Sequence, residues 1–335
     1  MNVKGALQNF FNSLKKKRKG KQVGFPRFKS KKKDKESYTT HCMSNSIRID
    51  SEKRKIKLPK LGFISYRDQR TIKDSEKIKS ATISKSKTGK YFLSIFLEFD
   101  LEHKGIKINK DTRVIGLDFS LPSFFIDNQG ESAGSQKFYR NSQKKLAKLQ
   151  KRVSKKRLGS KNRAKAQKKV NVVFEKITNC RKDWIHKLSS IIVRENDVII
   201  VEDINLQGLA QAMTWGKAIN DLGFGEFRRQ LEYKALWSSK LFLKSDKWFA
   251  SSQVCSDCGV KNPITKSLSV REWICEKCGS THNRDINAAK NLQKWGLDFL
   301  GLGRPDIKPV EIRDSLVIDE SRSVKQEALK SLVSE

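Results

Sequence analysis

Two closely spaced pairs of cysteines place the strongest constraint on how part of this chain folds. Cys255 and Cys258 form one Cys-x-x-Cys pair, and Cys275 and Cys278 form a second pair after 16 intervening residues. Each pair sets two thiolates on one tight turn, and two such turns complete a tetrahedral four-sulfur site of the kind that holds Zn²⁺. A glycine follows each pair directly, where a turn requires a positive φ.

Disulfide bonds are the main alternative for these cysteines. The first residues are polar and lysine-rich and contain no apolar stretch of a secretory signal, so we expect reduced thiols and one structural zinc ion. A four-cysteine site is closed, so its role is structural rather than hydrolytic. Cys42 and Cys180 have no partner in the sequence, and we interpret them as ordinary core or surface residues.

The charge of the chain indicates its partner. The 335 residues carry a formal net charge of +35, and no apolar run reaches the ~18 residues that a membrane span needs. Such a surplus makes a compact protein repel itself unless a polyanion neutralises it. Nucleic acid is therefore the first expected partner, and an anionic membrane surface is the second. We expect a cytoplasmic protein of a cell in which the chromosome is accessible, with no membrane partner.

One predicted helical hairpin, residues 141–195, is densely basic and is broken at Gly159-Ser160. Residues 136–182 hold 18 basic side chains and one acidic side chain. A solvated helical face is the plain alternative, but repulsion between like charges four residues apart destabilises free helices, and a phosphate backbone relieves it. The side chains that we expect to bind nucleic acid here are Lys144, Lys145, Lys148, Lys151, Arg152, Lys155, Lys156 and Arg157.

Short segments with alternating polarity predict a β-rich N-terminal region after a helix in residues 1–22. We expect strands at Ser46–Ile49, Lys55–Leu58, Ala81–Ser84 and Tyr91–Phe99, and further strands at Val114–Phe119, Ser123–Asp127 and Val198–Val201. The last of these is uniformly apolar, as in a strand buried on both faces. Helices are predicted over Gly225–Phe242 and Ile286–Trp295, and residues 301–335 have the composition of a disordered tail.

Three acidic residues stand at the ends of predicted elements. Asp118 ends the strand that begins at Val114, Glu202 follows the apolar strand, and Asp285 begins a helix seven residues after Cys278. Three carboxylates at one sheet edge favour Mg²⁺ or Mn²⁺, and a metal pair there serves phosphodiester cleavage. Each residue alone is more often a helix cap, a turn residue or a core residue, so only their order and spacing carry the hypothesis.

Several motifs together resemble one family. They are Ile115-Gly-Leu-Asp-Phe-Ser120, Val201-Glu-Asp-Ile-Asn-Leu-Gln-Gly208, the two cysteine pairs, and His282-Asn-Arg-Asp-Ile-Asn-Ala-Ala-Lys-Asn291. In this order they are similar to the TnpB family, the OrfB-type proteins of insertion sequences that are related to type V CRISPR effectors. The resemblance covers about residues 1–295. Asn283 stands where many members have Asp, and the chain resembles a member with a short N-terminus.

The resemblance implies a RuvC-like nuclease domain with an RNase H fold and cleavage of target DNA directed by a guide RNA. It assigns the catalytic acids to Asp118, Glu202 and Asp285, and it implies a nucleoid-associated protein of a prokaryote. The alternative is a truncated, cleavage-deficient DNA- or RNA-binding protein of the same transposon family. A transposase that joins strands itself is disfavoured, because the four scattered histidines do not suggest the required Tyr/His chemistry.

The resulting fold prediction is a mixed α+β and α/β protein. It has a small β-barrel-like N-terminal domain with a partial helical segment, and then a RuvC-like domain with an inserted four-cysteine zinc ribbon. The expected boundaries are 1–110 for the nucleic-acid-binding N-terminal domain, 111–250 for the nuclease domain, 251–283 for the zinc ribbon, 284–300 for the last nuclease motif and helix, and 301–335 for the tail.

The remaining notable residues are arginines, tryptophans and histidines. Arg271 and Arg284 flank the cysteine pairs, and Arg284 either contacts the scissile phosphate or forms a surface ion pair. The six tryptophans, Trp184, Trp215, Trp237, Trp248, Trp273 and Trp295, are expected mostly in the core. We interpret His186 as a packing residue of its helix.

Overall fold

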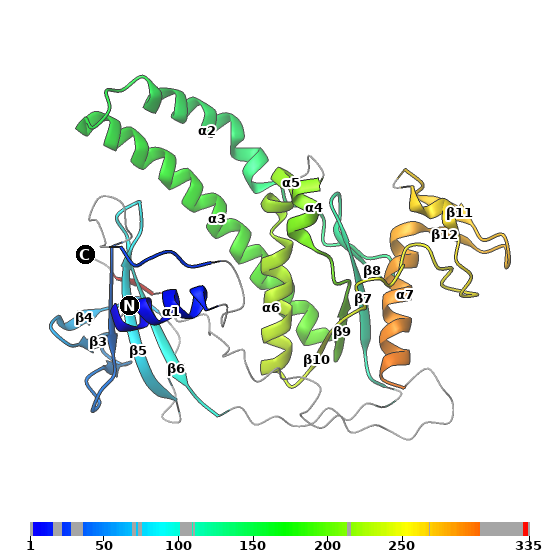
Figure 1. Cartoon of the computed structure of the whole chain (residues 1–335), viewed down its shortest axis with the longest axis horizontal. Helices are drawn as coiled ribbons and strands as arrows, with labels where there is room; N and C mark the ends of the chain where they lie inside the picture. Colours follow the sequence, from blue (N-terminus) through cyan, green and yellow to red (C-terminus); the bar gives the residue numbers. More distant parts are fainter. Residues whose placement is uncertain are drawn as a thin grey trace. The chain divides into compact units, whose positions relative to one another are not determined.

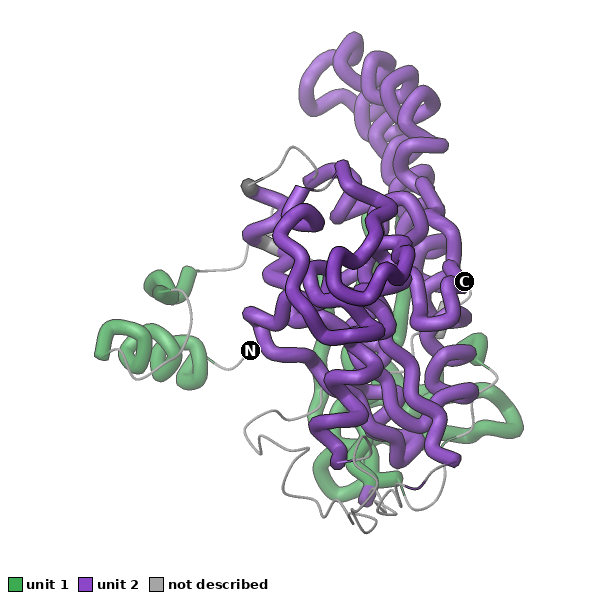
Figure 2. The backbone as a smooth tube through the Cα atoms, turned by 90° about the vertical axis from the view of Figure 1, so that its right-hand side faces the viewer, with its two compact units in different colours: residues 1–99, 325–335 green, residues 100–324 purple. Residues whose placement is uncertain are grey.

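The computed structural model describes residues 3–15, 22–27, 36–68, 72, 76–100, 109, 111–212, 216–267, 269–301 and 331–333. The chain divides into two compact units, which Figure 2 shows in different colours. The first comprises residues 1–99 and 325–335, and the second comprises residues 100–324.

The first unit is built from one helix and two antiparallel sheets. Helix α1 spans Val3–Leu14. One sheet has the order β1-β5-β6-β13 and the other the order β2-β3-β4. The strand bounds are β1 Ser37–His41, β2 Arg48–Asp50, β3 Lys55–Leu58, β4 Gly62–Ser65, β5 Lys77–Lys85, β6 Tyr91–Glu98 and β13 Ser331–Val333. The four strands expected before residue 100 are thus present at or near their predicted bounds.

Alternating burial explains why these short segments pair. In β3, Ile56 and Leu58 are buried, while Lys55 and Lys57 are exposed. In β6, the alternate residues Leu93 and Ile95 are buried. These side chains share one apolar cluster with Ile47. The described strands form two sheets, so barrel-like closure of this region stays a prediction. Most of the tail expected to be disordered lies outside the described residues, but its residues 331–333 form β13, which pairs with β6.

The second unit is centred on a four-stranded mixed sheet of order β10-β9-β7-β8. Its strands are β7 Val114–Ser120, β8 Phe124–Asp127, β9 Val198–Val201 and β10 Leu241–Lys244. β7, β9 and β10 run parallel, while β8 pairs antiparallel with β7. All four residues of β9 are buried, as its uniformly apolar sequence predicted.

Helices cover both faces of this sheet (Figure 1). The face with Leu117, Ile199 and Val201 packs in one apolar cluster with α3, Lys161–Glu195, and α6, Phe224–Trp237. The opposite face, with Val198 and Ile200, packs against α7, Arg284–Phe299. Short helices α4, Leu206–Ala212, and α5, Gly216–Leu222, precede α6.

The long helical hairpin forms as predicted. Helix α2 spans Phe138–Ser154, and α3 begins at Lys161. Gly159 has a φ of +77°, and the Ser160 side chain accepts a hydrogen bond from the amide of Arg163, so these two residues end one helix and cap the next.

One helical prediction was partly wrong. The segment Gly225–Phe242 was expected to be helical throughout, but α6 ends at Trp237 and Leu241 already belongs to β10. Ser239 adopts a φ of +51°, which breaks the helix. The following Leu-Phe-Leu run then pairs with β9, because a parallel strand beside a buried strand gives its apolar side chains more burial than another helical turn.

Candidate active site and four-cysteine metal centre

Strand register brings Asp118 and Glu202 to the same edge of the central sheet. Leu117 of β7 is paired in parallel with Val201 of β9, so the residues that follow each of them lie side by side. Strand β9 ends at Val201, whereas β7 continues to Ser120. Asp118 is paired with Ile126 of β8 and so lies inside its strand, not at the strand end that the sequence predicted.

Helix α7 adds the third carboxylate, that of Asp285. Gly116 lies two residues before Asp118 and therefore on the same face of β7. A Cβ at Gly116 would lie 2.2 Å from the carbonyl oxygen of Ala289, so α7 is seated directly on this face. Asp285 precedes Ala289 by one helical turn and so lies above the end of the strand. Asn283 caps the helix by accepting hydrogen bonds from the amides of Asp285 and Ile286.

The three carboxylates interact through their charges. Burial raises the pKa of Asp118 well above its usual range, and the neighbouring charges of Glu202 and Asp285 raise it further. Burial also raises the pKa of Glu202. The positive charges of Arg284 and Arg271 act in the opposite direction on Asp118. Asp118, Glu202 and Asp285 are each partly buried, and the repulsion within such a group of negative charges is relieved by a bound cation.

Two arginines from the cysteine-rich segment border the carboxylates. Nη1 of Arg271 lies 3.2 and 3.3 Å from the two carboxylate oxygens of Asp285. Arg284 is 9% exposed and donates to the carbonyl oxygen of Ser267. A surface ion pair, which was one of the two roles expected for Arg284, does not fit this burial. The charge of Arg284 nevertheless acts on both Asp118 and Glu202.

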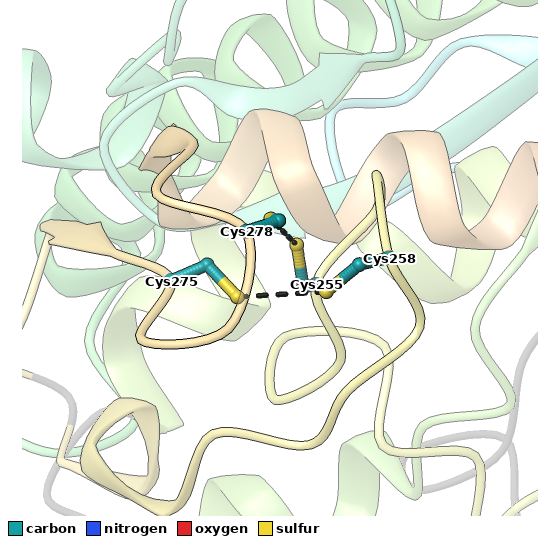
Figure 3. A group of neighbouring side chains, drawn as sticks. All are labelled: Cys255, Cys258, Cys275 and Cys278. Carbon is teal, nitrogen blue, oxygen red and sulfur yellow. Dashed lines mark hydrogen bonds between the residues drawn. The ribbon is translucent and has the colours of Figure 1, made fainter.

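The four cysteines form a compact cluster (Figure 3). Their sulfur atoms all lie within 4.8 Å of one another, with 3.7 Å between Cys255 and Cys278 and 3.5 Å between Cys258 and Cys275. Four ligands at the usual Zn–S distance in a tetrahedron are separated by about 3.8 Å, so this set fits zinc. In the described part of the chain no other set of three or more potential ligands is as compact, the three carboxylates included.

The two cysteine turns have the same local structure. In each, the amide of the following glycine donates to the carbonyl oxygen of the first cysteine, at 2.9 Å for Gly259 and 2.8 Å for Gly279. Both glycines have a φ of +74°, as the position after each pair predicted. Strands β11, Glu272–Ile274, and β12, Thr281–Asn283, form a hairpin around the second turn. Strand β12 continues directly into α7, so the cysteine cluster is joined to the helix that carries Asp285.

His282 belongs to this centre, although the sequence interpretation gave it no role. Its side chain is 6% exposed, its ring is tilted by 38° against that of Trp273 at 4.7 Å between centres, and its Nε2 lies 3.1 Å from the sulfur of Cys255. A histidine N–H beside a cysteine ligand can hydrogen-bond the thiolate and orient it. The sequence signal that could have indicated this role is the position of His282, only four residues after Cys278.

Two asparagines on α7 fasten the first cysteine turn, and the sequence interpretation also gave them no role. Asn287 accepts from the amide of Ser256 at 2.8 Å and donates to the carbonyl of Val254 at 2.7 Å. Asn291 donates to the carbonyls of Ser251 and Val254 at 2.7 and 2.6 Å. Their spacing of four residues, which puts both on one helix face, was a readable signal.

The predicted basic residues of the hairpin are displayed to solvent. Leu146 and Val153 of α2 are buried against Val170 and Ile177 of α3, which turns the lysines away from this contact. The residues in question are all exposed: Lys144, Lys145, Lys148, Lys151, Arg152, Lys155, Lys156 and Arg157. Only Arg284 of the predicted nucleic-acid-binding set lies elsewhere, beside the carboxylates.

The expectation that the tryptophans lie mostly in the core was wrong for two of them, Trp248 and Trp237. Trp184 and Trp273 pack in apolar clusters, whereas Trp248 is 87% exposed. Trp237 is 39% exposed, and Trp215 lies outside the described residues.

The fold and these sites define a mixed α/β protein with carboxylates at a sheet edge and an attached four-cysteine cluster that could hold a metal ion. Two family models match the chain: one described as "Probable transposase", of the OrfB_IS605 type, over residues 99–213, and one described as "Cas12f1-like, TNB domain" over residues 224–292.

Curated relatives extend the similarity along the chain. A "Putative RNA-guided DNA endonuclease" of Streptomyces pristinaespiralis is 34% identical over 326 residues, covering 96% of this chain and 75% of that protein. "Putative RNA-guided DNA endonuclease InsQ" of Escherichia coli is 28% identical, covering 89% and 73%. "TnpB-like protein L79" of Acanthamoeba polyphaga mimivirus is 26% identical, covering 57% and 38%. The chain belongs to the TnpB family.

Across the described part of the chain, no helix combines the length and the apolar character that crossing a membrane requires.

Proposed function

We propose that this protein is an RNA-guided DNA endonuclease that cleaves phosphodiester bonds at a RuvC-like site formed by Asp118, Glu202 and Asp285. The observation that carries the proposal is the closeness of the three carboxylates at one edge of the central sheet. The charges of Glu202 and Asp285 add to the effect of burial and raise the pKa of Asp118. The names of the relatives, which include RNA-guided DNA endonucleases, support the same reaction.

The carboxylates suit Mg²⁺ or Mn²⁺, because their oxygens are hard ligands. Burial, and then the charges of Glu202 and Asp285, raise the pKa of Asp118, and a bound cation would offset both effects. Divalent ions bound there supply an activated water and stabilise the leaving oxygen of a phosphodiester. The chain's own part is to hold the carboxylates in place: Asp118 and Glu202 through strand pairing, and Asp285 through the capped start of α7. Arg284 contributes positive charge beside the site, where a phosphate would enter.

The four cysteines hold a structural zinc ion in this proposal. The ion closes the two turns of residues 251–283 as a zinc ribbon and so fixes β12 and the start of α7. The domain assignments that go with this function are residues 1–110 for nucleic-acid binding, 111–250 for the nuclease core and 284–300 for its last motif.

The exposed lysines and arginines of the α2–α3 hairpin bind the backbone of the guide RNA and target DNA. Contacts of this kind position nucleic acid without reading its sequence, which guide pairing reads instead. With these partners the protein works where the chromosome lies, in the cytoplasm of a prokaryotic cell.

The decisive experiment is cleavage by the protein purified with the RNA that it carries. Sequencing that RNA identifies the guide, and matching DNA is then incubated with Mg²⁺. We expect cleavage by the parent protein and a loss of several orders of magnitude in Asp118→Ala, Glu202→Ala and Asp285→Ala, with DNA binding retained. Asp203→Asn is the matched control, because Asp203 adjoins Glu202 but is exposed and paired with Arg228. Binding without cleavage by the parent would instead favour the cleavage-deficient alternative.

A further inference from the structure

Trp248 is displayed to solvent by a loop that follows β10. It is 87% exposed, which is unusual for the most costly aromatic side chain to leave in water. The loop begins at the carboxyl edge of the sheet: the amide of Ser245 donates to the carbonyl of Val201 at 2.9 Å, and Glu202 is the next residue. Trp248 therefore lies in the loop that neighbours the carboxylates on the β10 side.

The loop is fastened at both ends, so this exposure is built into the fold. Ser245 is 2% exposed and tied to β9, as described above. On the other side, Phe249 packs against Trp295 of α7, and its amide donates to the carbonyl of Asp246 at 2.9 Å. Ser251 is 3% exposed, and its carbonyl accepts from Asn291. The turn between these anchors presents the indole ring outward.

A cation accompanies the ring. Nζ of Lys247 lies 5.1 Å from the centre of the Trp248 ring. An exposed aromatic face beside a lysine is the pairing that holds one nucleotide of an unpaired strand, because the ring stacks on the base and the ammonium group binds the adjacent phosphate. The contact of Phe249 with Trp295 puts the loop on the α7 face, where the carboxylates also lie.

We propose that Trp248 is a stacking platform for a base of single-stranded DNA that leads to or from the carboxylate site, with Lys247 on its phosphate. This inference rests on the proposed endonuclease function and adds the element that holds the strand beside the site. Trp295 lies ten residues after Asp285 on α7, so Phe249 contacts the helix about 15 Å along its axis from that carboxylate. The stacked base is thus a few nucleotides from the cleaved phosphate.

The test compares base-bearing and base-free DNA on the full chain. Oligothymidine of about 20 nucleotides and an abasic strand with the same number of phosphates are titrated in EDTA, where no cleavage occurs. We expect the parent to bind oligothymidine more tightly than the abasic strand. In Trp248→Leu the ratio of these two affinities should fall at least about fivefold, while the affinity for the abasic strand stays the same. Trp248→Phe should keep most of the preference, because it retains an aromatic face.

Trp237→Leu is the matched control. Trp237 is also partly exposed, but it precedes β10 and so lies at the opposite edge of the sheet. Its substitution should leave the preference unchanged. As a second measurement, oligonucleotides containing 5-iododeoxyuridine should cross-link to the peptide that contains Trp248.

Three results would overturn the inference. An unchanged preference in Trp248→Leu, or an equal loss of affinity for the abasic strand, would show that the ring does not stack on bases. Dependence on Trp248 with oligouridine but not with oligothymidine would show that the strand is RNA. If the parent binds neither oligonucleotide, the proposed function fails as well, whereas binding that is independent of Trp248 removes this inference alone.

Discussion

Gly116 of β7 lies against the backbone of α7 so closely that a Cβ on it would be 2.2 Å from the carbonyl oxygen of Ala289 and 2.7 Å from the amide nitrogen of Gln293. The helix that carries Asp285 therefore approaches the strand that carries Asp118 as far as the two backbones allow. A side chain at position 116 cannot be accommodated by rotating a neighbour, because the obstructing atoms belong to the backbone.

Gly116→Ala should consequently displace α7. We expect a loss of about 1–3 kcal/mol in the free energy of unfolding, from overpacking, together with a loss of DNA cleavage, since Asp285 moves with the helix. Chemical denaturation and the cleavage assay measure the two effects. Gly24→Ala is the control, because Gly24 has no atom within 4 Å of an added Cβ. Wild-type stability and cleavage in Gly116→Ala would contradict this packing.

The raised pKa of Asp118 predicts how stability depends on pH in the absence of divalent metal. The folded state holds the proton of this carboxyl more tightly than the unfolded state does, because of burial and the charges of Glu202 and Asp285. The free energy of unfolding should therefore fall as the pH rises from the pKa of the unfolded chain, about 3.9, toward the raised pKa of the folded state.

Asp118→Asn removes this penalty, so in EDTA it should melt at a higher temperature than the parent at neutral pH, and the difference should shrink below about pH 4. Mg²⁺ should stabilise the parent more than the variant. Thermal unfolding at several pH values measures both effects, with Asp203→Asn as the exposed control. If the variant were less stable than the parent at neutral pH, the charged carboxylate of Asp118 would not lower the free energy of unfolding.

Asn291→Ala should loosen the first cysteine turn. The substitution removes the side-chain donor to the buried carbonyl of Ser251, which costs about 1–3 kcal/mol for an unsatisfied buried group, whereas the carbonyl of Val254 keeps its bond from Asn287. We expect a lower unfolding midpoint and faster release of zinc to a colorimetric chelator. Lys290→Ala, one residue earlier and exposed, should release zinc at the parental rate. Equal release by both variants would mean that Asn291 does not secure the turn.

One zinc ion should bind per chain, and Cys275→Ser should lose it. Because the zinc turns continue through β12 into α7, we expect this variant to unfold the C-terminal part of the nuclease region rather than merely to slow cleavage. Elemental analysis and limited proteolysis measure occupancy and unfolding. Cys180→Ser is the control, since Cys180 is exposed and distant in sequence from the cluster. Reduced, folded parent protein without zinc would refute the assignment.

Lysines of α2 should set the salt dependence of nucleic-acid binding. Each phosphate contact removed lowers the slope of log affinity against log salt by about 0.9 for duplex DNA, so combining Lys144→Ala, Lys148→Ala and Lys151→Ala should lower it by about 2–3. Fluorescence anisotropy between 50 and 200 mM salt measures the slope. Lys187→Ala is the control, because Lys187 of α3 is already paired with Asp183. An unchanged slope in the triple variant would show that this face does not bind phosphates.

The sequence by itself determined the local features of this protein. The spacing of the cysteines and their glycines determined the two cysteine turns, because a turn of this kind is specified within five residues. The apolar run at Val198–Val201 determined a fully buried strand, and Gly159-Ser160 determined where the basic hairpin turns. The motifs that resemble the TnpB family indicated that family, and the comparison with known proteins confirmed it.

Only the tertiary structure decided what depends on contacts between distant segments. Leu241 and Phe242 continue a helical pattern locally, yet they form β10 because the exposed edge of β9 offers them pairing and burial. The seating of α7 on Gly116, the bond between Arg271 and Asp285, and the hold of Asn287 and Asn291 on the first cysteine turn each join residues that sequence periodicity does not relate. The exposure of Trp248 is likewise a property of the fold, because a tryptophan has the same apolar pattern in sequence whether its ring faces the core or water.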